Sequence, residues 1–360
     1  MTAEQKLVLF IGAGLFGLLL GSFLNVCIFR LPRQCMSIWK QTRSRCPKCR
    51  AFIAWYDNFP VVSWLVLKGR CRACRNPISP RYVVVELLTG GLVLWLAAAR
   101  FYPGGPAGIA SGYHPTPDDF QQGLLWASQV YLVAALIVSA FIDFDFRILP
   151  DEINYSGLFA GLAMCTAFPF LHLGAPIYIG EFFTQAPGLL SSKIGSYPAA
   201  FAASALGAGA GAGMTYFIRL VGTPLFRREA MGLGDVKLMA FLGAWLGWRA
   251  ILITFMLGCL FGSIYGLVQL PFTRKMGEIW FGPFLALGAL LFVVAGHTVD
   301  RVLETAIAAL RARTEWMVQQ GPVVTVAIMS VPFAILVWML VRIWRRSRQE
   351  PDDPPQGGTA

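Results

Sequence analysis

Aspartates beside apolar runs are the residues in this sequence best suited to chemistry. Asp235 lies in the tetrad Gly232-Leu-Gly-Asp, directly before a long apolar run, and Asp143 closes another apolar run. A charged side chain within a hydrocarbon layer costs about 2.5 to 3.5 kcal/mol at a helix centre, so it is normally paired and functional. Two aspartates that approach each other share one proton, and the pair can act as general base and general acid in peptide hydrolysis.

The partner of Asp235 is sought in the short segment that runs from Asp143 to Asp151. Asp143 is held on the end of a predicted helix, whereas Asp145, two residues on, points to the opposite face. Asp151 follows a proline and precedes a new apolar run, so we expect it to cap that helix. We therefore choose Asp143 and Asp235 as the catalytic pair. The alternative interpretation of the tetrad is a tight turn in which Asp235 caps the next helix.

The residues around Asp235 support a site. Gly232 and Gly234 are expected to adopt backbone conformations closed to other residues and to leave room for a substrate chain beside the carboxylate. Lys237 follows in the same motif. The sequence contains no His-Glu-x-x-His metalloprotease motif and no Gly-x-Ser-x-Gly nucleophile motif, so paired aspartates are the best-supported apparatus.

Four cysteines form a second constellation, within the only long polar segment of the chain. They make two Cys-x-x-Cys pairs, and they are Cys46, Cys49, Cys71 and Cys74. This spacing predicts one structural zinc ion held by four thiolates in a reducing compartment, rather than disulfides. A segment of about fifty residues is too short to form a stable hydrophobic core alone, so a bound metal ion is expected to stabilise it. A redox function of the cysteines is the alternative.

Composition predicts the elements that must position these groups: an all-α polytopic membrane protein. Of the 360 residues, 56% are hydrophobic and only 14% are charged. Apolar runs predict nine membrane spans, which are 7–29, 82–99, 124–142, 155–173, 198–220, 236–248, 251–272, 281–296 and 323–343. The net charge of +11 is explained by membrane orientation, and we expect no nucleic-acid binding.

The positive-inside rule orients these spans. With the N-terminus outside, most of the 30 Lys and Arg residues fall on the cytoplasmic side. Asp143, Asp151 and Asp235 then share the cytoplasmic membrane face. The three histidines fall on the far side, away from the acids; they are His114, His172 and His297.

Several polar or small residues in the spans have two possible functions. Ser22 and Asn25 either pack helices together or belong to a site. Glu86 is either an interfacial residue with its carboxylate in water or part of a polar site that faces the bundle. The Ala/Gly-rich stretch 205–213 is expected to let neighbouring helices approach closely.

Motifs spread along the chain form one ordered set over residues 7 to about 298. They are Gly21-Ser-Phe-Leu-Asn-Val with Arg30-Leu-Pro, the paired Cys-x-x-Cys, Ile78-Ser-Pro-Arg-Tyr, Val85-Glu-Leu, Ile142-Asp, Pro150-Asp and Gly232-Leu-Gly-Asp-Val-Lys-Leu. This set resembles the type IV prepilin peptidase family, which consists of GxGD aspartyl proteases. By position, the resemblance implies Asp143 and Asp235 as the catalytic pair, in agreement with the choice made from the residues.

The resemblance implies two activities. The first is an aspartyl endopeptidase of the bacterial inner (cytoplasmic) membrane, with its active site facing the cytoplasm, that removes the leader of type IV prepilins or type II secretion pseudopilins. The second is S-adenosylmethionine-dependent N-methylation of the new N-terminal residue, usually phenylalanine. No residue is assigned to S-adenosylmethionine, because no glycine-rich cofactor loop is visible. The expected partners are prepilin or pseudopilin N-terminal segments and membrane lipid.

The predicted domains follow from the apolar runs and the cysteine spacing. They are 1–29 as the first transmembrane helix, 30–81 as a cytoplasmic zinc-binding domain, 82–298 as the protease core, 299–344 as an amphipathic segment with an extra span, and 345–360 as a disordered cytoplasmic tail. About eight spans are typical of the family, so the ninth is an addition. Two other functions compete with the protease: an ion- or proton-coupled transporter, which predicts spans broken at mirrored positions, and a scaffold in which the zinc domain binds a partner.

Overall fold

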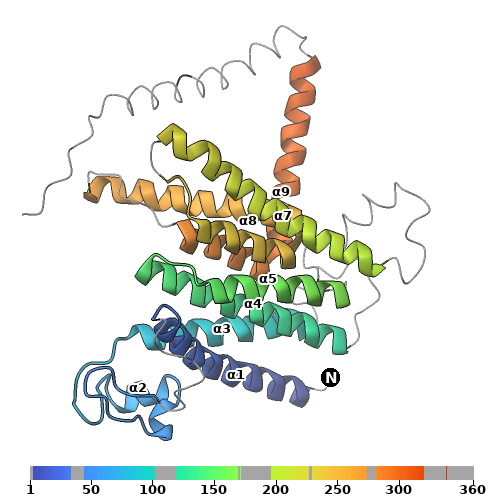
Figure 1. The fold of residues 1–360 in the computed structure, drawn as a ribbon. Helices are drawn as coiled ribbons and strands as arrows, with labels where there is room; N and C mark the ends of the chain where they lie inside the picture. The colour runs from blue at the N-terminus through green and yellow to red at the C-terminus, as the bar shows by residue number, and fades with distance from the viewer. Residues whose placement is uncertain are drawn as a thin grey trace, which may run out of the picture. The chain divides into compact units, whose positions relative to one another are not determined.

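All the regular elements in the part of the chain that the computed structural model describes are helices, apart from two isolated β-bridges in residues 44–80 (Figure 1). The described residues are 3–33, 44–101, 119–168, 171, 196–226, 229–273, 281–319 and 338. The helices are α1 (Ala3–Arg30), η1 (Trp55–Asn58), α2 (Val62–Val66), α3 (Arg81–Phe101), α4 (Asp119–Phe146), α5 (Asp151–Ala167), α7 (Ser196–Phe226), α8 (Leu233–Thr273) and α9 (Phe281–Gln319). The all-α prediction is confirmed.

Five of these helices are long and apolar enough to cross a membrane. Their candidate spans are Leu7–Arg30, Arg81–Phe101, Phe120–Phe146, Tyr197–Leu225 and Leu233–Gln269. Four of them match predicted spans within a few residues. The predicted span 155–173 corresponds to α5, which begins earlier, at Asp151, and has 17 residues. The predicted span 281–296 is the shorter apolar helix Phe281–Gly296 at the start of α9.

Two predicted boundaries between helices are confirmed as breaks within α8 and α9. The predicted spans 236–248 and 251–272 are the two helical parts of α8, which is interrupted at Gly247, where φ is 82° and ψ is 170°. The predicted span 281–296 ends where α9 is interrupted at Ala295, and the segment predicted as an amphipathic helix follows it to Gln319. The predicted ninth span lies outside the described residues, apart from Trp338.

The structure divides into two compact units. The first comprises residues 1–214 and 233–297, and the second comprises residues 215–232 and 298–360. In the second unit, Arg219 donates a hydrogen bond to the carbonyl oxygen of Met231 at 2.5 Å and pairs with Glu229 at 2.9 Å. All the candidate site residues except Gly232 lie in the first unit.

Small residues bring the helices of the first unit into close contact. A Cβ added at Gly17 of α1 would lie 2.9 Å from the Cα of Gly90 in α3. Gly207 of α7 and Gly243 of α8 face each other so closely that a Cβ on either would overlap the carbonyl oxygen of the other. The prediction that the Ala/Gly-rich stretch permits close helix approach is therefore confirmed.

A buried acid connects the first helices to the cysteine segment. Glu86 in α3 is only 8% exposed, and its Oε2 accepts a hydrogen bond from the backbone N–H of Val61 at 2.8 Å. Val61 has a φ of 60°, which is rare for a β-branched residue, so this carboxylate holds a strained turn. Ser22 and Asn25 of α1 interact with the same carboxylate. The carboxylate of Glu86 therefore faces the helix bundle and is not an interfacial group in water.

Candidate active site

Asp143 lies in the last turn of α4, where side-chain packing and the C-terminal hydrogen bond of the helix fix the backbone. Its neighbour Ile142 is completely buried, and Asp143 itself is 8% exposed. The N–H of Arg147 donates to the carbonyl oxygen of Asp143 at 2.9 Å, and Arg147 has a φ of 57°. This is the left-handed conformation with which helices commonly end. The carboxyl group is thus held on a rigid element, as the sequence predicts.

Asp235 lies in the first turn of α8 and is 9% exposed. The preceding Gly234 packs against Leu149, which belongs to the connection between α4 and α5; a Cβ on Gly234 would lie 2.9 Å from the Cβ of Leu149. Gly234 is part of the helix, and among the described glycines positive φ occurs at Gly69 and Gly247. The prediction of unusual backbone conformations at Gly232 and Gly234 is therefore wrong, since neither has a positive φ. Gly234 instead lies where the two segments touch.

The carboxyl groups of Asp143 and Asp235 meet at Gly282, in the first turn of α9. The three atoms nearest to a Cβ added at Gly282 all belong to these two aspartates. That Cβ would overlap Oδ2 of Asp143, and it would lie 3.0 Å from Cγ of Asp143 and 3.4 Å from Oδ1 of Asp235. Both carboxyl groups therefore lie next to the same glycine and border one small region of the structure.

The other acids of the segment point away from this space. Asp145 forms an ion pair with Arg81, which also donates to the carbonyl oxygen of Phe141 at 3.2 Å. Asp151 accepts two hydrogen bonds from Lys237, at 2.7 and 2.9 Å. The prediction that Asp151 caps α5 is wrong, because it is the first helical residue and the N-cap position is occupied by Pro150. Its carboxylate binds the lysine of the neighbouring helix instead.

Lys237 ties α8 to α5 beside the aspartates. In addition to Asp151, it lies 5.1 Å from the centre of the Tyr155 ring. More deeply, Nε1 of Trp245 in α8 donates to the carbonyl oxygen of Gly157 in α5 at 2.8 Å. These contacts fix the start of α8, and with it Asp235, relative to the segment that carries Asp143.

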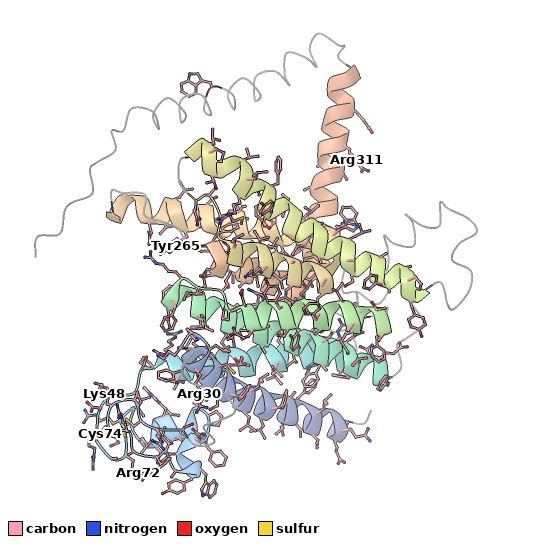
Figure 2. The ribbon with its side chains drawn as sticks, in the orientation of Figure 1. Arg30, Lys48, Arg72, Cys74, Tyr265 and Arg311 are labelled. Carbon is pink, nitrogen blue, oxygen red and sulfur yellow. The ribbon has the colours of Figure 1, made fainter. Side chains whose placement is uncertain are left out.

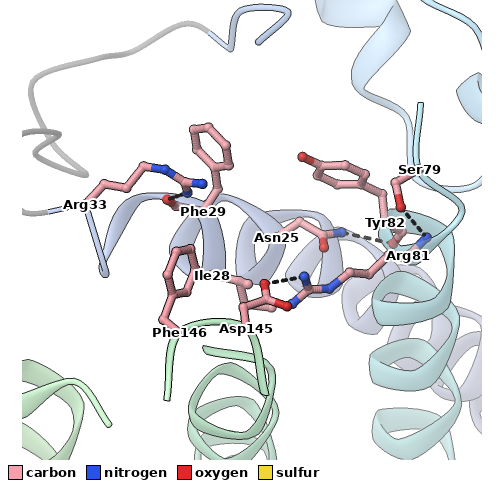
Figure 3. Close-up of a pocket in the computed structure, with 9 residues that line it drawn as sticks. All are labelled: Asn25, Ile28, Phe29, Arg33, Ser79, Arg81, Tyr82, Asp145 and Phe146. Atoms are coloured by element: carbon pink, nitrogen blue, oxygen red, sulfur yellow. Dashed lines mark hydrogen bonds and ion pairs between the residues drawn. The ribbon is translucent and has the colours of Figure 1, made fainter. Parts of the chain in front are cut away.

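A pocket of about 180 Å³ opens beside Asp145, between the ends of α1, α3 and α4 (Figure 3). Its polar groups are already paired: Arg81 with Asp145, Asn25 with the carbonyl oxygen of Tyr82 at 3.0 Å, and Arg33 with that of Phe29 at 2.5 Å. A second, apolar pocket of about 230 Å³ lies between α4, α5 and α8. Both are smaller than the roughly 300 to 1,000 Å³ typical of pockets for drug-sized ligands.

The four cysteines come together in two loops of the same construction. Cys46 N–H donates to Ala51, and Arg50 N–H donates back to Cys46; Cys71 and Arg75 repeat the pattern, with Asn76 as the acceptor. Arg50 and Arg75 both have a φ near 60°, at 59° and 60°. Each loop therefore presents two thiols on one tight turn, and the loops lie in the segment between α1 and α3 (Figure 2).

The thiols are arranged as a metal ion would require. Their four sulfur atoms all lie within 4.8 Å of one another, and Sγ of Cys46 is 3.9 Å from Sγ of Cys74. Tetrahedral zinc with Zn–S bonds of about 2.3 Å needs sulfurs roughly 3.8 Å apart. The backbone N–H and then the side-chain amide of Asn76 lower the pKa of Cys74 to about 6, which favours the thiolate that binds metal.

Gly282 was not predicted as a site residue, and the function of Glu86 was not decided from the sequence. Both residues form close contacts with groups far away along the chain, and neither belongs to a sequence motif typical of an active site. His114 and His172 lie outside the described residues, and the side chain of His297 is not described.

Two families match the chain in sequence. Residues 15–100 match the Bacterial Peptidase A24 N-terminal domain, and residues 130–267 match the Type IV leader peptidase family. The first match contains the cysteine cluster and Glu86, and the second contains Asp143 and Asp235. No solved structure matches the chain.

Curated relatives extend the match over most of the chain. A "Prepilin leader peptidase/N-methyltransferase" of Myxococcus xanthus is 36% identical over 261 residues, which are 72% of this chain and 63% of that protein. One from Aeromonas salmonicida is 32% identical over 312 residues, 80% of this chain and 91% of that protein. A "Type 4 prepilin-like proteins leader peptide-processing enzyme" of Escherichia coli is 32% identical and covers 76% and 89%, respectively.

Proposed function

The chain belongs to the type IV leader peptidase family, and from this premise we propose that it is a prepilin leader peptidase and N-methyltransferase. It cleaves the leader of type IV prepilins or type II secretion pseudopilins and then methylates the exposed N-terminal amine. The observation that carries the peptidase is the pair of buried aspartates, Asp143 and Asp235, bordering one space at Gly282. The names of the curated relatives support both activities.

The two carboxyl groups supply the chemistry of peptide hydrolysis. One aspartate is ionised and takes a proton from a water molecule, whose oxygen attacks the carbonyl carbon of the scissile peptide. The other is protonated and donates a hydrogen bond to the carbonyl oxygen, which gains negative charge in the transition state. The C–N bond then breaks as the leaving nitrogen takes a proton from the pair. Packing of Gly234 against Leu149 holds the two aspartates in place for these steps.

The cysteine cluster has a structural function in this proposal. Cys46, Cys49, Cys71 and Cys74 would hold one zinc ion with their four thiolates, and the bound metal would support folding rather than hydrolysis. It would fix residues 44–80, which Glu86 joins to α3 through Val61.

S-adenosylmethionine supplies the methyl group for the second activity. The pockets of about 180 and 230 Å³ are smaller than such a cofactor needs, so no residue is assigned to its binding. The methyl acceptor is the amine that the peptidase step exposes, so methylation follows cleavage.

The protein is proposed to lie in the bacterial cytoplasmic membrane with the aspartates at the cytoplasmic face. Five apolar helices and the excess of Lys and Arg predicted on that side support this orientation. These cations would also contact anionic lipid headgroups. The transporter alternative has no support from the relatives, whose names describe peptidases and methyltransferases.

Cleavage of a prepilin peptide by the purified protein in detergent tests the peptidase assignment. The unmodified protein is expected to release the leader, and Asp143→Asn or Asp235→Asn is expected to abolish release. Asp145→Asn is the matched control, because its carboxylate pairs with Arg81 and points away from the other two. Cleavage at a normal rate by either catalytic variant would reject the assignment.

A further inference from the structure

We infer that Gly282 is a positioning residue of the peptidase: its missing side chain lets the Asp143 carboxyl group lie against α9, next to Asp235. The inference rests on the proposed peptidase activity. It concerns a residue outside the match to the Type IV leader peptidase family, which ends at residue 267.

The geometry at Gly282 is specific to the two aspartates. A methyl group there would overlap Oδ2 of Asp143, at a distance that real Cβ atoms essentially never show, and it would lie 3.0 Å from Cγ of Asp143, tighter than most real Cβ contacts. The next atom it would meet is Oδ1 of Asp235, at 3.4 Å, which is ordinary contact. An added methyl group would thus take the place that the Asp143 carboxyl group now occupies, and that carboxyl group would have to move.

The backbone of α9 cannot retreat to relieve this overlap, because the helix is pressed against α8. A Cβ at Gly288 would lie 2.6 Å from the carbonyl oxygen of Thr254, and one at Gly258 would lie 3.3 Å from the Cα of Leu285. These close backbone contacts begin less than one turn after Gly282.

Aromatic side chains on both sides of Gly282 also hold α9 in place along α8. Phe281 packs edge-on against Phe255 of α8, with ring centroids 5.7 Å apart, and Phe284 packs against Tyr265 at 5.2 Å. With α9 fixed on α8, a methyl group at residue 282 has to be accommodated by rotation of the Asp143 carboxyl group, away from Asp235.

The kinetic test compares two glycine variants in purified protein with a prepilin peptide. Gly282→Ala is expected to lower kcat about a hundredfold with little change in KM, because misplacement of a reacting group by about 1 Å has an effect of that size. Gly262→Ala is the matched control: Gly262 is also a buried helical glycine, but its added Cβ would meet only the Phe284 ring, at 3.7 and 3.9 Å. The control is expected to cleave at the normal rate.

A stability cycle tests the same contact without activity. Gly282→Ala should lower the melting temperature in the natural background but not in an Asp143→Ala background, because the overlapping carboxyl group is then absent. An equal loss in both backgrounds would mean that Gly282 serves only helix packing and would overturn the inference. The cycle remains decisive if Gly282→Ala alone folds poorly, since the double variant is then expected to fold.

The outcomes separate this inference from the proposed function. If the unmodified protein fails to cleave any prepilin peptide, the proposed function fails, and the stability cycle still tests the contact at Gly282. If Asp143→Asn abolishes cleavage but Gly282→Ala cleaves at the normal rate, only the inference fails.

Discussion

The aspartate pair and the cysteine cluster are built in opposite ways. The four cysteines come from two copies of one local loop, and all lie between Cys46 and Cys74. The aspartates come from α4 and α8, and both lie next to a glycine of α9, so α4 must pack correctly against two helices that follow much later in the chain. A metal cluster can thus be encoded by spacing alone, whereas the proposed catalytic centre exists only when the helices are assembled.

The largest effect is expected when one carboxyl group of the aspartate pair is replaced, which tests whether the two regions are independent. Asp143→Asn or Asp235→Asn should slow prepilin cleavage by about a thousandfold, within the range measured for loss of general acid–base catalysis. Zinc content and the protease resistance of the cysteine segment should not change, because its four ligands are local. Loss of zinc in these variants, measured by metal analysis, would contradict the independence of the two regions.

The converse experiment removes the metal site. Cys46→Ser combined with Cys71→Ser should eliminate bound zinc and expose residues 44–80 to limited proteolysis, because structural zinc contributes directly to folding. Cleavage should fall far less than in the aspartate variants. Cys27→Ser is a matched control, since Cys27 is buried in α1 outside the cluster. A cleavage defect as deep as that of Asp143→Asn would show that the zinc domain forms part of the active site.

Glu86 connects the cysteine segment to α3, and its removal should have an intermediate effect. Glu86→Ala leaves the part-buried N–H of Val61 without its acceptor, a loss of about 1 kcal/mol in local stability. Hydrogen exchange at the Val61 amide should accelerate accordingly. Glu86→Gln keeps a carbonyl acceptor and should show a smaller change. Equal exchange rates in both variants and the natural protein would show that this hydrogen bond does not hold the turn.

The ion pair between Lys237 and Asp151 should matter least. Both side chains are partly exposed, so Asp151→Asn should cost only about 0.2 to 1 kcal/mol, as is typical of surface ion pairs. The cleavage rate should change only a few-fold, and the difference in melting temperature should shrink at high salt. A loss of cleavage comparable to that of Asp235→Asn would place Asp151 in the catalytic machinery instead.

Much of the fold followed from hydropathy because the apolar runs are long and the intervening segments are polar. The starts and ends of α1, α3, α4 and α7 agree with predicted spans within a few residues. The predicted boundaries also lie close to the breaks at Gly247 and Ala295. The sequence pattern missed the contribution of Asp151, because the carboxylate that suggested a local cap binds Lys237 from another helix.

The sequence by itself determined the helical class, the cysteine cluster and the candidate acids, because hydrophobicity and the Cys-x-x-Cys spacing act over a few neighbouring residues. Tertiary structure alone decided that Asp143 and Asp235 border one space, that Glu86 is buried under Val61, and that Gly282 faces the two carboxyl groups. These relations depend on how closely helix backbones pack. A glycine is identical in sequence whether it faces lipid, a backbone or a carboxyl group, and only the assembled helices distinguish the three.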